Sequence, residues 1–283
     1  TTITPIERNR VNLSFNVIEG EAARIREIRI VGAKQISEST LRDQMDLSTG
    51  NWMSWYTKTD RYSRTKFNAD LEAIKSYYLN RGFLEFRIDS TQVSISPDRL
   101  SMNLTINVFE GQRYAVSGVQ LEGYYLGREE EFKSLIRIEV GKPYNIAQVT
   151  ETTKAFTDYF GNFGYAFARV EPTPEIDRAT NRVKLVLKAD PARRAYVRRV
   201  NITGNIRTRD EIIRREIRQF ESSWYDAEKI KRSKERVDRL GYFKEVNVET
   251  PQVPGTDDQV DVNYSVEEQA SGSITASVGF AQS

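Results

Sequence analysis

The segment Arg198-Arg199-Val200-Asn201-Ile202-Thr203-Gly204 decides the fold because close copies of it stand at residues 117–123 (SGVQLEG) and 26–32 (REIRIVG). In each copy apolar and polar residues alternate and then stop at a glycine. The alternation predicts a half-buried strand, and the glycine predicts a turn that needs a permissive backbone. A segment that returns along the chain indicates a tandem repeat.

A second recurring segment follows each copy, at residues 78–83 (YLNRGF), 160–165 (FGNFGY) and 237–242 (VDRLGY). Apolar residues with helical spacing precede each of these segments, for example Leu71, Ile74 and Tyr78. The pattern predicts a helix that ends on its glycine in the left-handed conformation, followed by an aromatic residue that starts a new strand.

A third set of alternating segments closes each repeat, at residues 104–108, 183–187 and 260–264. Thr208 and Glu211 have the spacing of a capping box, which predicts a further short helix early in the repeat. The order is therefore strand, helix, helix, strand, strand. We predict an α+β fold, a tandem array of three domains with two helices on a three-stranded mixed sheet. A lone copy of the last strand, at residues 11–17, precedes the first full repeat.

The composition excludes several classes of function. Lys and Arg total 42 against 40 Asp and Glu, and a net charge of +2 predicts no nucleic-acid partner. The chain has no Cys and no His, which excludes Cys nucleophiles, Ser-His-Asp triads and the common zinc sites. The carboxylates form no recognisable hydrolase motif, so we expect no enzyme, no metal and no cofactor. No apolar window is long enough for a membrane-spanning helix.

The repeat unit resembles the POTRA (polypeptide-transport-associated) family. The segments that carry the resemblance are residues 76–82 (SYYLNRG), 89–94 (DSTQVS), 212–216 (IIRRE) and 253–262 (VPGTDDQVDV). The three copies are similar to the third, fourth and fifth POTRA domains of Gram-negative outer-membrane assembly factors. The bounds implied are a truncated preceding domain, represented by its last strand, at 1–20, full domains at 21–110, 111–191 and 192–268, and a linker with the first barrel strand at 269–283.

Residues 273–280 (SITASVGF) also alternate, with Ile274, Ala276, Val278 and Phe280 on one face. An apolar face opposite a face of small polar residues is typical of a transmembrane β-barrel strand. Taken alone, the pattern is better explained by an ordinary amphipathic strand. Its place directly after the POTRA-like array favours a first barrel strand.

The family topology implies one kind of binding edge. The second strand in chain order lies at the edge of the sheet, where free N–H and C=O groups can accept an extended chain as an added strand. The alternative is a plain edge that Arg87 and Asp89 protect. In the first full repeat the implied edge runs roughly to Ile95, and its predicted binding residues are Phe86, Arg87, Ile88, Asp89, Ser90, Thr91, Gln92 and Val93.

A second implied site is Arg214-Arg215-Glu216 in the last repeat, where the resemblance implies docking of an accessory lipoprotein, with Glu216 pairing to a basic residue of the partner. The alternative is a solvated helix face. Trp52 and Trp55 lie in an aromatic insertion that we interpret as plugging its own repeat rather than as a binding loop. The charged clusters 128–131 and 193–194 are interpreted as solvated faces.

The function that the resemblance implies is that of a scaffold on the periplasmic face of the outer membrane. Its partners would be accessory outer-membrane lipoproteins and unfolded outer-membrane proteins, which it would feed to a membrane β-barrel. The alternative is the POTRA region of a related secretion or translocation pore. The additional strand before the first full repeat argues against a three-repeat protein of that kind.

Overall fold

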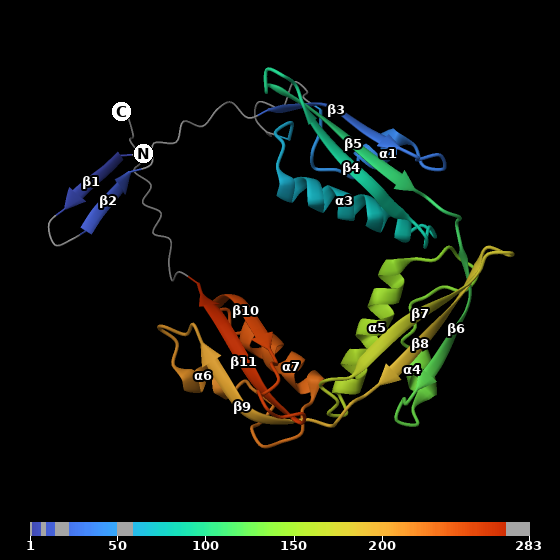
Figure 1. Ribbon diagram of the computed structural model, residues 1–283. Helices are drawn as coiled ribbons and strands as arrows, with labels where there is room; N and C mark the ends of the chain where they lie inside the picture. Colours follow the sequence, from blue (N-terminus) through green and yellow to red (C-terminus); the bar gives the residue numbers. More distant parts are fainter. Residues whose placement is uncertain (1, 7–9, 15–22, 50–58, 270–283) are drawn as a thin grey trace, which may run out of the picture. The chain divides into compact units, whose positions relative to one another are not determined.

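A computed structural model describes residues 2–6, 10–14, 23–49 and 59–269 of the chain (Figure 1). The chain divides into two compact units, Thr1–Tyr114 and Ala115–Ser283. The first unit holds a hairpin and the first repeat: β1 (Thr2–Ile6), β2 (Arg10–Ser14), β3 (Arg24–Val31), α1 (Glu38–Arg42), α3 (Arg64–Leu79), β4 (Arg87–Ile95) and β5 (Ser101–Phe109).

The second unit holds two further repeats. The second repeat consists of β6 (Ala115–Gly123), α4 (Glu129–Lys133), α5 (Ile146–Gly161), β7 (Arg169–Asp177) and β8 (Arg182–Asp190). The third consists of β9 (Tyr196–Thr203), α6 (Asp210–Arg214), α7 (Ala227–Asp238), β10 (Phe243–Glu249) and β11 (Gln259–Glu268).

The three sheets share one topology, which confirms the predicted fold class. Their orders are β3-β5-β4, β6-β8-β7 and β9-β11-β10, so that the last strand of each repeat lies in the middle (Figure 1). The first strand runs parallel to it, and the second strand is its antiparallel hairpin partner. Each sheet is therefore mixed, and each has two edge strands.

The start of the chain differs from the prediction of one lone strand. Strand β2 pairs with the preceding β1 in an antiparallel hairpin, with Ile3 opposite Leu13. A strand with no neighbour would leave both rows of its backbone groups without protein partners, and the hairpin supplies one of these rows. Residues 15–17 of the expected strand lie outside the described residues.

Each repeat has its own apolar core between the helices and one face of the sheet. The long helices place Ile74 and Tyr78, Phe156 and Phe160, and Val237 in these cores, as their spacing predicts. Helix α3 ends at Leu79 and closes with a tight turn before Gly82, which has the expected positive φ, +97°. The helix therefore ends three residues before the predicted glycine.

In every repeat, the glycine at the end of the first strand lies against the backbone of the central strand, with no room for a side chain. A Cβ atom built on Gly32, Gly123 or Gly204 would lie 2.1, 2.1 or 2.0 Å from the carbonyl oxygen of Val108, Ala189 or Val266, respectively. All three glycines have positive φ values. The turn thus presses directly on the end of the central strand, which no residue with a side chain allows.

The link from one repeat to the next uses the second glycine. The amide of Tyr114 donates to the carbonyl of Gly82 at 2.8 Å, and the amide of Ala195 donates to that of Gly164 at 2.7 Å. In the second unit Arg194 also donates to the carbonyl of Phe163 at 2.9 Å and lies over the ring of Trp224. Arg194 is exposed, as the interpretation of residues 193–194 as a solvated face predicts, and it also fastens the joint.

We predict that Gly204→Ala lowers the free energy of unfolding of the third repeat by at least about 3 kcal/mol, because the new Cβ meets the Val266 carbonyl and alanine disfavours a φ of +87°. Gly255→Ala is the matched control, since its φ is +77° but open space surrounds it. It should cost only about 1 kcal/mol. Urea denaturation followed by Trp224 fluorescence, with Trp52 and Trp55 replaced by Phe, measures both; equal losses would contradict the steric argument.

Candidate functional site

Strand β4 is an edge strand of the first sheet and pairs only with β5. The side chains from Asp89 to Ile95 are all exposed, including Val93 at 40 % and Ile95 at 54 %. No hydrogen bond from another described residue reaches the outer row of backbone groups on β4. The predicted edge is therefore present as an open edge, while its role in binding stays a prediction.

The first residues of the predicted edge, unlike those from Ser90 onward, are either buried or charged. Phe86 lies before the strand and is buried, with its ring stacked on Tyr78 at a centroid distance of 4.1 Å. Arg87 and Asp89 pair with each other at 2.7 Å. An exposed pair of this type contributes little to stability, and its charges stand only at the beginning of the strand. From Ser90 onward the edge carries no charge.

The equivalent second strands of the other repeats are protected. Strand β7 contains Pro172 and Pro174, and its register with β8 continues through both without a shift. Proline has no amide hydrogen, so both residues must face outward, where they remove two donors from the edge. Strand β10 carries Lys244, Glu245 and Glu249 instead. Both devices discourage strand addition, which leaves β4 as the one strand of the three that has no proline and carries no charge from Ser90 onward.

The trio Arg214, Arg215 and Glu216 is spread over the end of α6. Arg214 is the last helical residue and binds Asp210 and, at 3.2 Å, the carbonyl of Val200. Arg215 is exposed. The carboxylate of Glu216 is only 15 % exposed and pairs at 2.7 Å with Arg236 of α7. Arg236 was not singled out in the sequence, because nothing in the spacing of residues 216 and 236 indicates a pair.

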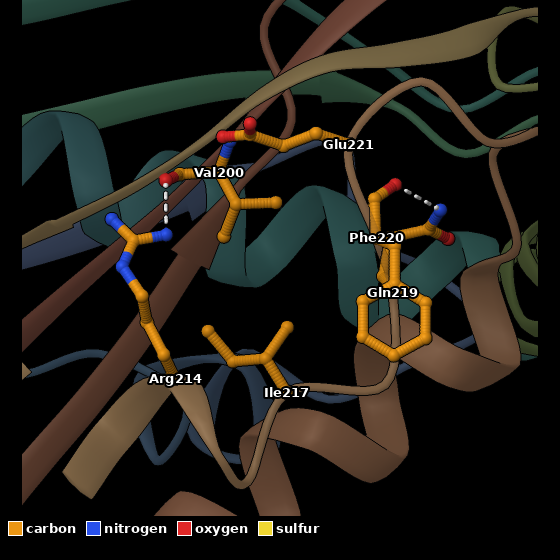
Figure 2. Close-up of a pocket in the computed structure, with 6 residues that line it drawn as sticks. All are labelled: Val200, Arg214, Ile217, Gln219, Phe220 and Glu221. Atoms are coloured by element: carbon orange, nitrogen blue, oxygen red, sulfur yellow. Dashed lines mark hydrogen bonds between the residues drawn. The ribbon is translucent and has the colours of Figure 1, made fainter. Parts of the chain in front are cut away.

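A small hollow lies beside this trio, with a volume of about 210 Å³. Arg214 lines one end and Phe220 the other, with Val200 and Ile217 between them (Figure 2). The Phe220 ring is two-thirds exposed, at 66 %. The hollow therefore combines an apolar floor with a cation, a surface that suits one apolar side chain of another protein.

Two carboxylates serve as anchors for loops rather than as reactive groups. Glu110 accepts hydrogen bonds from the amides of Lys34, Gln35 and Ile36 and from the hydroxyl of Tyr78. Burial raises the pKa of Glu110, but the donors outweigh it and hold that pKa below its usual value. Glu268 holds the equivalent loop of the third repeat through the amides of Arg207 and Thr208.

Other predicted sites fall outside the described residues. These are the insertion with Trp52 and Trp55 and the segment with Ile274, Ala276, Val278 and Phe280. Within the described ranges, no cluster of three or more acidic side chains is arranged to hold a metal ion. In the same ranges no helix has the length and apolar character needed to cross a membrane.

The architecture defines a class of protein: a tandem array of small two-layer α+β domains, each with its last strand in the middle of the sheet. The chain belongs to the POTRA family, whose model, described as surface antigen variable number repeat, matches residues 23–111, 114–192 and 195–269. The resemblance seen in the sequence is thus confirmed. The bounds of the individual domains and the roles of the predicted binding residues remain expectations.

Relatives and solved structures agree with this assignment. The chain is 36 % identical to the outer membrane protein assembly factor BamA of Neisseria meningitidis, over 99 % of this chain and 35 % of that protein. It is 27 % identical to BamA of Buchnera aphidicola, over 97 % of this chain and 44 % of that protein. The chain is also similar to the crystal structure of Haemophilus influenzae BamA POTRA3-5, with a TM-score of 0.76 and 28 % identity. The superposition covers 89 % of this chain and 100 % of the Haemophilus chain. The chain therefore spans less than half of these two relatives.

We predict that Glu110→Gln flattens the loss of stability in acid. Because the pKa of Glu110 is lowered in the folded state, its ionised form contributes stability above the unfolded value of 4.5 and loses that contribution as the pH falls through the folded pKa. The urea midpoint of the parent chain should fall more steeply below pH 4.5 than that of the variant. Glu72→Gln, on the exposed face of α3, is the control and should keep the parent slope. Parallel curves for the parent and Glu110→Gln would contradict the anchor role.

Proposed function

We propose that this chain is the periplasmic POTRA region of an outer-membrane protein assembly factor. It binds accessory lipoproteins and nascent outer-membrane proteins and passes them to a membrane β-barrel. Its binding sites are surfaces on the repeats, and its action on its partners is to hold and orient them. The family match and the similarity to BamA relatives support this proposal.

The observation that carries the proposal is the open edge of β4. Backbone N–H and C=O groups are the same in every polypeptide, so an edge that binds through them accepts many sequences. Each hydrogen bond contributes about 0.5–1.5 kcal/mol net, so a few of them give a weak and reversible complex. Such binding suits a scaffold that must release what it holds. The uncharged stretch from Ser90 to Ile95 offers no side chain that repels an added strand.

The surface at the end of α6 is the proposed docking site for an accessory lipoprotein. Arg215 is exposed and pairs with Glu216 at 3.5 Å, and Phe220 offers exposed apolar area on the same surface. Glu216 reaches the surface only at one edge, and its negative charge is shared with Arg236. A cation of the partner would complete a three-charge arrangement, which sets orientation more than affinity.

We predict that the double variant Thr91→Pro/Val93→Pro weakens binding of a substrate strand at least about tenfold, because it removes two outward donors from β4. Thr91 and Val93 lie opposite Ile106 and Leu104, the same positions of the central strand that face Pro172 and Pro174 in the second repeat. The second repeat therefore shows that the ladder tolerates prolines there. Fluorescence anisotropy of a labelled peptide from an outer-membrane strand measures the affinity.

The reverse change is the matched control for this experiment. Pro172→Thr/Pro174→Val restores two donors to β7 and should add a binding site for the same peptide. Urea denaturation of both variants checks that their repeats remain folded. If the proline variant of β4 stays folded and binds the peptide as tightly as the parent, strand addition at β4 is wrong.

We predict that the charge-reversed pair Glu216→Arg/Arg236→Glu keeps the stability of the third repeat but loses binding to the lipoprotein. The reversed pair can still form, so folding is retained, whereas the partner meets the opposite charge. Glu216→Arg alone should lose both, because it leaves Arg236 facing a like charge. Pull-down of lipoproteins by the full-length protein, with unfolding measured in parallel, separates the two effects. Full binding by the double variant would remove Glu216 from the docking site and leave the scaffold role intact.

A further inference from the structure

The outer edge of β6, in the second repeat, lacks the side-chain closure found on the equivalent strands β3 and β9. Val119 lies opposite Leu185 of the central strand, and Leu121 lies opposite Leu187. Counted from the glycine that ends the strand, Val119 occupies the position of Ile28 in β3 and of Val200 in β9. The backbone groups at this position point away from the central strand, as the bonds of Val200 show.

In the first and third repeats, side chains of the same repeat close this edge. Arg42 donates to the carbonyl of Ile28 at 3.4 Å, and Glu38 accepts from the amide of Ile30 at 3.1 Å. In the third repeat the side chains that close the edge both bind the backbone of a single residue, Val200. Arg214 donates to the carbonyl of Val200 at 3.2 Å.

The amide of Val200 is closed as well, because it donates to Glu221 at 2.8 Å (Figure 2). An Arg–Glu pair thus occupies both backbone groups of Val200. An incoming strand would have to displace two charged side chains to bind there, so β9 is protected by the protein itself.

The second repeat lacks both closing groups. Lys133 stands at the position of Arg42 and Arg214, but its ammonium binds Glu130 at 2.6 Å. Val140 stands at the position of Glu221, and it is 58 % exposed. Among residues 23–49 and 59–269, none donates to or accepts from the outward groups of Val119 or Leu121.

The open part of the β6 edge has a definite start and a definite end. At the start of β6 the loop from Gly141 to Lys142 bonds to both backbone groups of Val116, which closes that end. The open part therefore begins after Val116 and ends where Gly123 turns away. On the other side of the same sheet Pro172 and Pro174 blunt β7. The second repeat thus has its free edge on the first strand, where the first repeat has it on the second strand.

We propose that the edge of β6 at Val119 and Leu121 binds a short extended segment of another polypeptide as an added strand. Outward amides and carbonyls at strand spacing are complementary to another extended backbone. Val119 and Leu121 are partly buried and pack on the core of the repeat, whereas Val140 is 58 % exposed, so the segment carries an apolar residue that packs on Val140. This edge is separate from β4 and does not depend on lipoprotein docking.

The sharpest test transfers the closing pair of the third repeat into the second. Lys133→Arg/Val140→Glu supplies the two groups that occupy Val200 at the equivalent position in β9. The probe is a short peptide of alternating valine and threonine, added to the isotope-labelled chain and followed by amide resonances in NMR. In the parent, the amides of Val119 and Leu121 should shift on titration. The double variant should weaken that effect at least about tenfold.

Hydrogen exchange gives an independent reading without the peptide. In the free parent chain the amide of Val119 should exchange faster than that of Val200, and the double variant should slow it toward the rate of Val200. The converse variant, Arg214→Lys/Glu221→Val, should open β9 and create peptide-dependent shifts at Val200. These two variants act on side chains at the surface, so the core of each repeat stays unchanged.

Two results would overturn the proposal. One is a Val119 amide that exchanges as slowly as that of Val200 in the free parent chain. The other is peptide-dependent shifts that persist unchanged in the folded Lys133→Arg/Val140→Glu chain or that never appear at β6. The β4 variant Thr91→Pro/Val93→Pro separates this edge from the proposed substrate edge, because it should leave the shifts at Val119 and Leu121 intact.

Discussion

The hydrogen-bonding requirement of the sheet edges is the constraint on which the rest of this structure depends. A three-stranded sheet has one strand that is paired on both sides and two that are paired on one side only. Every outward amide and carbonyl must then be met by a side chain, by water or by another chain. Here the repeats solve the same problem differently: with an Arg–Glu pair at β9, with prolines at β7, and, among the residues that the structure describes, with no closing group on β4 or on β6 beyond Val116.

The cores and joints of the repeats are, by contrast, nearly the same. In each repeat a glycine is pressed against the carbonyl of the central strand, and the helix packs its apolar side on the sheet. The carbonyls of Gly82 and Gly164 each receive the first amide of the segment that leads into the next repeat. Since the core requirements are met once per repeat in the same way, differences accumulate at the edges. A tandem array of one fold can thereby present several distinct surfaces to its partners.

The site residues show where reasoning from the sequence reached its limit. The edge position of β4 followed from the family topology, but Phe86 belongs to the core because the chain turns inward before the strand begins. Arg194 reads as one of many exposed cations, yet it closes the joint by lying over Trp224. Glu216 and Arg236 are twenty residues apart and on different elements, so only the packing of α7 against the end of α6 brings them together.

The sequence by itself determined the order of the elements, the repeat and its glycine turns, because alternation, helical spacing and φ preferences act over a few neighbouring residues. It also contained the prolines of β7. The tertiary structure alone decided which edges are open, since closure at Val200 requires that Arg214 and Glu221, 14 and 21 positions further along the chain, both meet its backbone groups. That meeting depends on how a short helix and its loop lie against the sheet, which no local pattern encodes.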